Sequence, residues 1–194
     1  LSLSGRLGAR ALGGDFDYRI LSSRAAAYLR MPWHRHHVLA LIANAGTSGG
    51  EIGGRGAFSL GGPPLTESAI DTLLRLGVLG ENLLRGYAPG SFAGSEFFLG
   101  SVEYRFPLSW LDAAPGWLPL YLGKLSGTLF ADAGNAFDTW LPETLHPSVG
   151  AELRLSYHLG WGALDGALRL GTAWGFHREQ GGGFHHYVGL GAYF

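Results

Sequence analysis

The sequence predicts an all-β fold, a transmembrane antiparallel β-barrel with eight strands in this chain and one long extracellular loop. Two observations support this prediction. Apolar and polar residues alternate with a period of two in eight segments, as in strands with two different faces. The composition is also poor in charge and rich in aromatic residues and glycine, which is typical of a transmembrane barrel.

The composition limits the class of protein. Charged residues make up 15% of the 194 residues, against roughly 25% in soluble domains, and 33 residues are glycine. The formal net charge of −1 gives no sign of nucleic-acid binding. The chain has no cysteine, which excludes disulfides and thiolate metal sites.

The apolar stretches are too short for membrane helices. The longest uncharged ones, 38–46 and 113–123, fall well below the roughly 18–20 residues that a spanning helix needs. A membrane-embedded chain must then pair its backbone between strands. We expect one domain, residues 1–194, with strands at about 1–12, 16–31, 37–46, 95–107, 121–134, 147–158, 163–176 and 184–194.

The later strands show which face meets lipid. Polar side chains share one face with acids and bases matched, whereas Leu, Val and aromatic residues share the other. The predicted inward set includes Ser101, Glu103, Arg105, Lys124, Ser126, Thr128, Asp132, Glu152, Arg154, Ser156, Asp165 and Arg169. A soluble β-domain is the alternative. In the second strand, Arg19, Arg24 and Arg30 share a face only if a bulge near Ser22–Ser23 resets the register.

The last strand carries the ending of a bacterial outer-membrane barrel. Phe184, Val188 and Phe194 point one way, Tyr187 and Gly189 point the other, and the final residue is aromatic. We take Tyr187, Gly189 and Phe194 as the C-terminal strand signal. The C-terminus is then expected in the periplasm and the long loop outside the cell.

The long loop, about residues 47–94, far exceeds ordinary connections and is expected to be functional. Ser68 and Asp71 resemble a helix start, which predicts a short helix at about 67–76; an irregular loop is the alternative. The connection Pro107–Leu120 is long for a periplasmic turn.

Three motifs follow one another along the chain. Leu84–Tyr87 reads LRGY, 95–108 reads SEFFLGSVEYRFPL and 129–135 reads LFADAGN. This series resembles the BamA/TamA/FhaC-type superfamily of outer-membrane assembly and secretion barrels, also known as the bacterial surface antigen family, in its C-terminal half. The resemblance implies a loop folded back into the barrel and locked in the lumen by Arg85, Gly86, Tyr87, Glu103, Phe130, Asp132 and Gly134.

The physical chemistry of these residues supports such a lock. Glu103 and Asp132 fall on the inward face of adjacent strands, where two carboxylates repel each other and favour a cation between them. The planar guanidinium of Arg85 can bind both, and Gly86 allows a tight turn. Alternatively, Arg85 is solvated, and the carboxylates pair with Arg105 or Lys124.

The size of the loop conflicts with a closed eight-stranded barrel, whose interior is only just filled by side chains. Either about eight further strands complete a larger barrel, or the loop lies across the outside. The sequence starts at Leu1 without an initiator methionine or signal peptide. We expect either a C-terminal fragment or a stand-alone half-length barrel that self-associates.

The resemblance implies a protein that inserts or translocates polypeptides at the outer membrane, and neither catalytic residues nor a cofactor. Its expected partners are outer-membrane lipid, unfolded outer-membrane or secreted polypeptides, and a second copy or a larger envelope complex. Gly189 and Gly191 would weaken pairing at the seam between the first and last strands, which could admit an incoming strand. A structural or anchoring barrel subunit is the alternative, and a passive pore is a third option.

Histidines raise two further possibilities. His34 and His36 lie on the same side of a turn, but no third metal ligand is evident. At the extracellular rim, His146 with Ser148 and His177 with Glu179 could form enzyme-like pairs, but neither lies in a nucleophile motif. We therefore predict no metal site and no enzyme.

Overall fold

The fold of the chain was analysed in a computed structural model. The structure describes residues 1–10, 13, 17–50, 58–62, 83–114, 116, 118–139, 141–160 and 164–192. These residues form an all-β fold, and the one helical segment among them is a short 3₁₀ turn, Arg178–Gln180. The described part of the chain contains no helix long and apolar enough to cross a membrane.

Eight antiparallel strands form one sheet, in the order β1-β2-β3-β6-β7-β8-β9-β10. Each strand pairs with the next main strand along the chain, so the sheet is a simple meander interrupted by the long connection between β3 and β6. The bounds are β1 Ser2–Gly8, β2 Tyr18–Arg30, β3 Val38–Gly50, β6 Glu96–Ala113, β7 Leu120–Phe137, β8 His146–Leu159, β9 Leu164–Gly175 and β10 Phe184–Ala192. The eight predicted strands are all present.

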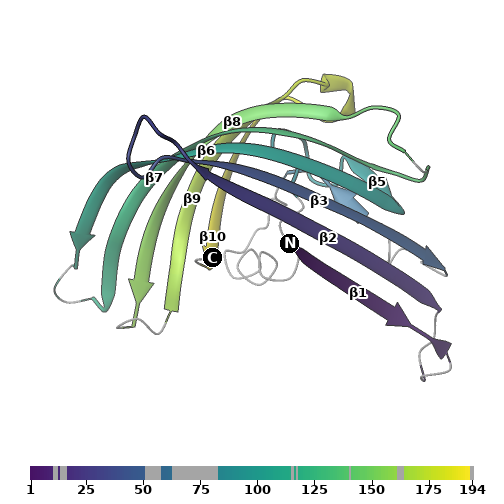
Figure 1. The fold of residues 1–194 in the computed structure, drawn as a ribbon, viewed down its shortest axis with the longest axis horizontal. Helices are drawn as coiled ribbons and strands as arrows, with labels where there is room; N and C mark the ends of the chain where they lie inside the picture. The colour runs from purple at the N-terminus through teal and green to yellow at the C-terminus, as the bar shows by residue number, and fades with distance from the viewer. Residues whose placement is uncertain are drawn as a thin grey trace.

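The eight strands do not close into a barrel, so the stand-alone eight-stranded barrel, one of the two forms expected from the sequence, is not seen. β1 and β10 stand at the two ends of the strand order and are not paired with each other. Figure 1 shows the sheet bent into an open arch. Closing eight strands would leave room only for their own side chains, whereas here segments of the long connection occupy the concave side.

Three strands run further than predicted. β3 continues to Gly50, β7 to Phe137, and β6 passes through Pro107 to Ala113. The predicted connection Pro107–Leu120 is therefore mostly strand, and only residues 114–119 separate β6 from β7. Register shifts between Pro107 and Ser109 and between Trp110 and Ala113 accommodate the proline, which cannot donate a ladder hydrogen bond.

The predicted bulge in β2 is absent. Tyr18–Arg30 pairs with β3 in one continuous register, so residues of odd and even number keep to opposite faces throughout. Arg19 consequently lies on the face opposite to Arg24 and Arg30, beside Gly49. No reset of the register is needed, because the three arginines do not share a face.

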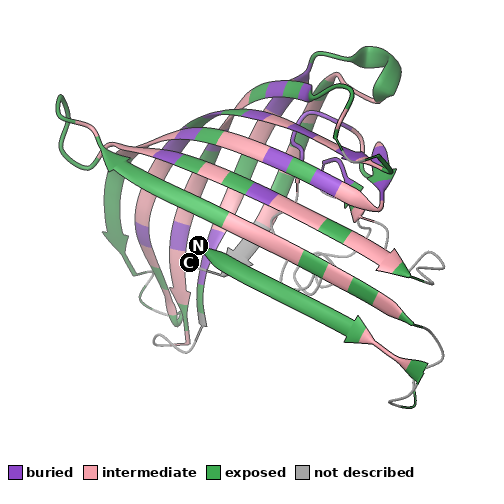
Figure 2. Ribbon diagram, turned by 45° about the vertical axis from the view of Figure 1, so that its right-hand side comes forward, coloured by how far each residue is buried: buried purple, intermediate pink, exposed green. Residues whose placement is uncertain are grey.

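The two faces of the sheet differ as the alternation predicts. On the convex face, Leu153, Leu170 and Val188 are register neighbours on three adjacent strands, and each is about half exposed or more. Exposed apolar side chains in the same face of β6 to β10 are Phe98, Val102, Leu129 and Val149. Figure 2 shows the buried residues alternating with exposed ones along the central strands. Such a continuous apolar surface is suited to lipid rather than water.

Parts of the long connection pack against β6 and β7. Two short strands, β4 Phe58–Leu60 and β5 Phe92–Gly94, form a two-stranded antiparallel sheet that the sequence did not predict. Side chains of these two strands and of residues 84–87 pack against side chains of β6 and β7 in one buried cluster. Its members are Leu60, Leu84, Tyr87, Phe92, Phe97, Leu99 and Ala136. The described parts of the loop thus lie inside the arch, not across its outside. The predicted helix at 67–76 falls outside the described residues.

Candidate functional site

The segment Leu84–Tyr87, here called the tip, is held inside the arch. Leu84 and Tyr87 are fully buried, and Arg85 is 6% exposed. Backbone hydrogen bonds join the tip to the connection between β9 and β10: Gly183 N–H donates to Gly86 O at 3.2 Å, and Ala88 N–H donates to Gly181 O at 2.9 Å. The tip is therefore fixed by its backbone as well as by its side chains.

Gly86 is required by the geometry of the tip. Its φ of +89° is a left-handed conformation that favours glycine. A Cβ added there would also lie 2.8 Å from Gly175 N, too close for any real contact. The glycine of the RGY sequence thus lets the loop backbone approach β9 closely.

Arg85 binds both predicted carboxylates. Its Nε donates to Asp132 Oδ2 at 2.7 Å, and its Nη2 donates to Asp132 Oδ1 at 2.7 Å and to Glu103 Oε1 at 2.9 Å. Two parallel bonds to one carboxylate are the geometry in which a guanidinium binds most specifically. Ser101 on β6 completes the group, accepting from Arg85 at 3.0 Å and donating to Asp132 at 2.6 Å.

The register explains why these groups meet. Ser101 is paired with Asp132 and Glu103 with Phe130 across β6 and β7, so all four side chains point into the arch side by side. The guanidinium carbon of Arg85 lies 3.5 Å from the centre of the Phe130 ring, a close cation–π contact. Burial disfavours the charge of this loop arginine, but the hydrogen bond and charge of Asp132, followed by the charge of Glu103, raise the pKa of Arg85 above its usual range.

Of the alternative pairings of the two carboxylates, with Arg105 or with Lys124, only that of Glu103 with Arg105 is present among the described residues. Glu103 does bind Arg105, through Oε2 at 2.8 Å from Arg105 Nε, while its other oxygen binds Arg85. Among the described residues, Lys124 makes no ion pair with either carboxylate, and its Nζ lies 5.3 Å from the centre of the Trp110 ring. Arg85 is buried, which excludes the solvated alternative.

Two other members of the predicted set shape the space around the tip. Gly134 leaves room for the side chains of Leu60 and Leu99, since an added Cβ would lie 3.3 Å and 3.0 Å from them. Tyr87 donates its hydroxyl hydrogen to Pro147 O at 2.8 Å and packs edge-on against Phe92. Glu103, Asp132 and Phe130 thus contact Arg85 directly, whereas Gly86, Tyr87 and Gly134 shape the packing of the loop beside them.

A second polar cluster, not singled out from the sequence, centres on Glu152. Arg169 binds both oxygens of its carboxylate at 2.9 and 2.8 Å, Arg154 donates at 3.2 Å, and Tyr187 donates its hydroxyl hydrogen at 2.8 Å. Tyr187 of the predicted C-terminal signal thus points into the arch and ties β10 to β8. Gly189 pairs with Arg169, and Phe194 lies outside the described residues. The sequence pattern places Glu152, Arg154 and Arg169 on the same inward face, and this is the feature from which the cluster could have been predicted.

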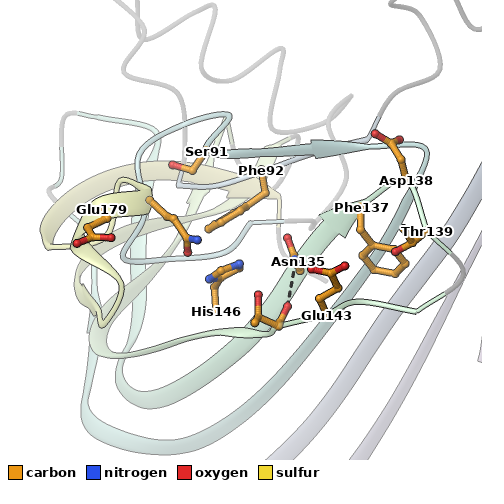
Figure 3. A pocket seen from close by; sticks show the side chains of 11 residues that line it. Ser91, Phe92, Asn135, Phe137, Asp138, Thr139, Glu143, His146 and Glu179 are labelled. Atoms are coloured by element: carbon orange, nitrogen blue, oxygen red, sulfur yellow. Dashed lines mark hydrogen bonds between the residues drawn. The ribbon is translucent and has the colours of Figure 1, made fainter.

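The rim residues form a pocket rather than a catalytic pair. His146 Nδ1 lies 3.3 Å from His177 Nδ1, and the His146 ring stacks on Phe92 at 4.2 Å. Figure 3 shows this pocket of about 560 Å³, with Glu143 and Glu179 among the residues that line it. Ser148 Oγ is buried and has no hydrogen-bond partner among the described residues. His146 therefore meets a second imidazole and not a nucleophile.

The histidines of the β2–β3 turn contact aromatic residues. His34 stacks on His37 with ring centres 4.8 Å apart, and His37 Nδ1 lies 2.7 Å from Tyr104 Oη. Partial burial, followed by the nearby His34 and His36, lowers the pKa of His37. Within the described ranges, no group of three or more histidine or carboxylate side chains could hold a metal ion.

A comparison with models of protein families shows what the chain is similar to. The family model of the Omp85 superfamily domain matches residues 1–194, which is the whole chain. No curated protein matches the chain significantly.

Proposed function

Because the chain belongs to the Omp85 superfamily, whose general role is outer-membrane protein assembly and secretion, we propose that it takes part in inserting or translocating polypeptides at the bacterial outer membrane. The family consists generally of non-enzymatic assembly and translocation factors. The observation that supports this proposal most directly is the binding of the tip to the concave face through Arg85.

In this proposal, the ion-paired tip keeps the long connection inside the arch and so fixes the shape of the sheet. Asp132 and Glu103 belong to the two longest strands, β6 and β7, while the tip backbone also binds the β9–β10 connection. One loop segment thereby links the middle of the sheet to its C-terminal edge. A rigid sheet with a defined edge is what templated strand addition needs.

The edge strand β10 is the proposed place of contact with a polypeptide. It pairs with β9 alone among the described strands, so one row of its backbone donors and acceptors faces no strand within this sheet. Gly189 and Gly191 contribute no side chains to hold a neighbour, which favours exchange of partners. An extended polypeptide could add to this edge by backbone hydrogen bonding.

The proposed orientation places the C-terminus in the periplasm. The connections at that end of the sheet are short, whereas the long β3–β6 connection lies at the other end. Outer-membrane lipid would cover the convex face. Residues 1–194 would then form the C-terminal half of a larger barrel or a half-barrel completed by a second copy.

A liposome assay tests the activity. The folded chain is reconstituted in vesicles, and the folding rate of an unfolded client barrel is measured against empty vesicles and vesicles holding the Arg85→Ala variant. The proposal expects faster client folding with the wild-type chain and a smaller gain with the variant. No acceleration by the wild-type chain would favour a structural or anchoring role in an envelope complex.

A further inference from the structure

In the ion pairs on the concave face, arginine side chains outnumber carboxylates among the described residues. Glu103 is shared between Arg85 and Arg105, and Glu152 is shared between Arg154 and Arg169. Asp132 is used by Arg85. Four arginine side chains thus share three carboxylates, which leaves one positive charge uncompensated within this group.

Arg154 is the arginine whose positive charge is least compensated by a carboxylate. Arg154 and Arg169 are direct register partners on β8 and β9, an arrangement in which like charges repel. Both donate to the same oxygen, Glu152 Oε1, but Arg169 holds the carboxylate with two short bonds, whereas Arg154 makes one at 3.2 Å. The Nε of Arg154 is buried and has no hydrogen-bond partner within the described residues. A buried donor without a partner is unusual in a folded protein.

The arginines remain open on one side. The side chains of Arg105, Arg154 and Arg169 are 30%, 26% and 31% exposed, whereas that of Glu152 is 1% exposed. Arg105 pairs with Thr128, and Thr128 pairs with Glu152, so Arg105 lies in the same register row as the carboxylate that Arg154 and Arg169 share. Three partly exposed guanidinium groups therefore surround carboxylates that are themselves buried, so the accessible surface of the cluster is cationic.

We propose that Arg105, Arg154 and Arg169 form a binding site for a compact oxyanion, a carboxylate or a phosphate group, on the concave face of the sheet. The forked guanidinium donors match the geometry of either group. A bound oxyanion would accept hydrogen bonds from the exposed guanidinium groups and would screen the repulsion between Arg154 and Arg169. This site adjoins the tip, because Glu103 binds both Arg105 and Arg85, but it does not depend on polypeptide insertion.

Thermal unfolding of the full folded chain in detergent tests the site. Inorganic phosphate or acetate replaces chloride at constant ionic strength and constant pH. The wild-type chain should unfold at a higher temperature with the oxyanion, because a ligand that binds only the folded state stabilises it. A rise with both anions indicates carboxylate recognition, and a rise with phosphate alone indicates recognition of phosphate groups.

Variants separate binding from a general salt effect. Arg154→Gln should abolish the rise, whereas Arg35→Gln, which removes the same charge from an exposed position in the β2–β3 turn, should retain it. If Arg154→Gln does not fold, Arg154→Lys keeps the charge but loses the fork and Nε, and it should show a smaller rise. The proposal is overturned if the wild-type chain shows no rise, or if the rise is equal in the wild-type chain and every Arg154 variant.

Discussion

Truncation of Arg85 should release the tip from the sheet. Arg85→Ala removes two bonds to Asp132, one to Glu103 and one to Ser101. Glu103 keeps Arg105, but the Asp132 side chain, 1% exposed, keeps only Ser101. Breaking a buried ion pair from one side costs about 3–5 kcal/mol, so opening of the tip should become at least roughly 100-fold more frequent.

Two measurements report how often the tip opens. The first is the rate at which protease cleaves the connection between β3 and β6 in membrane-reconstituted protein, and the second is the temperature at which the folded form is lost in unboiled gel samples. Both should report faster opening in Arg85→Ala and little change in Arg35→Ala, which removes an exposed arginine from the β2–β3 turn. Arg85→Lys should fall between, because an ammonium group cannot form the parallel pair of bonds.

A double-mutant cycle checks that the effect arises from the ion pair. Arg85→Ala and Asp132→Ala together should destabilise the tip by less than the sum of the single changes, with a coupling of roughly 0.5–3 kcal/mol. Unchanged proteolysis and heat stability in Arg85→Ala, or strict additivity in the cycle, would refute the reasoning.

Three further changes have defined outcomes, the first two in the same two assays and the third in chemical denaturation. Gly86→Ala should loosen the tip more than Gly90→Ala. Both glycines have a positive φ, but an added Cβ would lie 2.8 Å from a backbone atom at Gly86 and 3.5 Å from a side-chain oxygen at Gly90. Equal effects of the two substitutions would contradict the close approach of the backbone at Gly86. Tyr87→Phe removes one hydrogen bond to Pro147 O and should cost about 0.5–1.5 kcal/mol, far less than Arg85→Ala. Glu152→Gln leaves two arginines without their carboxylate and should destabilise the β8–β10 edge by roughly 1.5–3 kcal/mol in chemical denaturation, and a neutral result would show that the cluster is not structural.

The alternation of residue types was sufficient to predict the strands and their faces, because a period of two follows directly from strand geometry. The inward phase of Glu103 and Asp132 predicted that these carboxylates would share one space, and the RGY sequence identified a cation to bind them. Strand ends were predicted less well. β6 extends beyond Pro107 because the register shifts there tolerate a missing donor, which no local pattern in the sequence indicates.

Features that depend on the path of the loop could not be predicted. The small β4–β5 sheet has only three residues in each strand, too few for alternation to be visible. The contact between His146 and His177 depends on where the β9–β10 connection lies relative to the start of β8. Whether the eight strands close on themselves could not be decided from the sequence, because periodicity gives the number of strands but not their curvature.

The central claim is that lipid covers the convex face of the sheet while the concave face stays polar. Because the chain has no cysteine, single cysteines can be placed at Leu153 and Leu170 on the convex face and at Ser126 on the concave face, and each labelled with a fluorophore. In vesicles, we expect quenchers attached to lipid chains to quench positions 153 and 170 strongly and position 126 weakly. Strong quenching of 153 and 170 by a water-soluble quencher, with no effect of the lipid-bound one, would contradict the account.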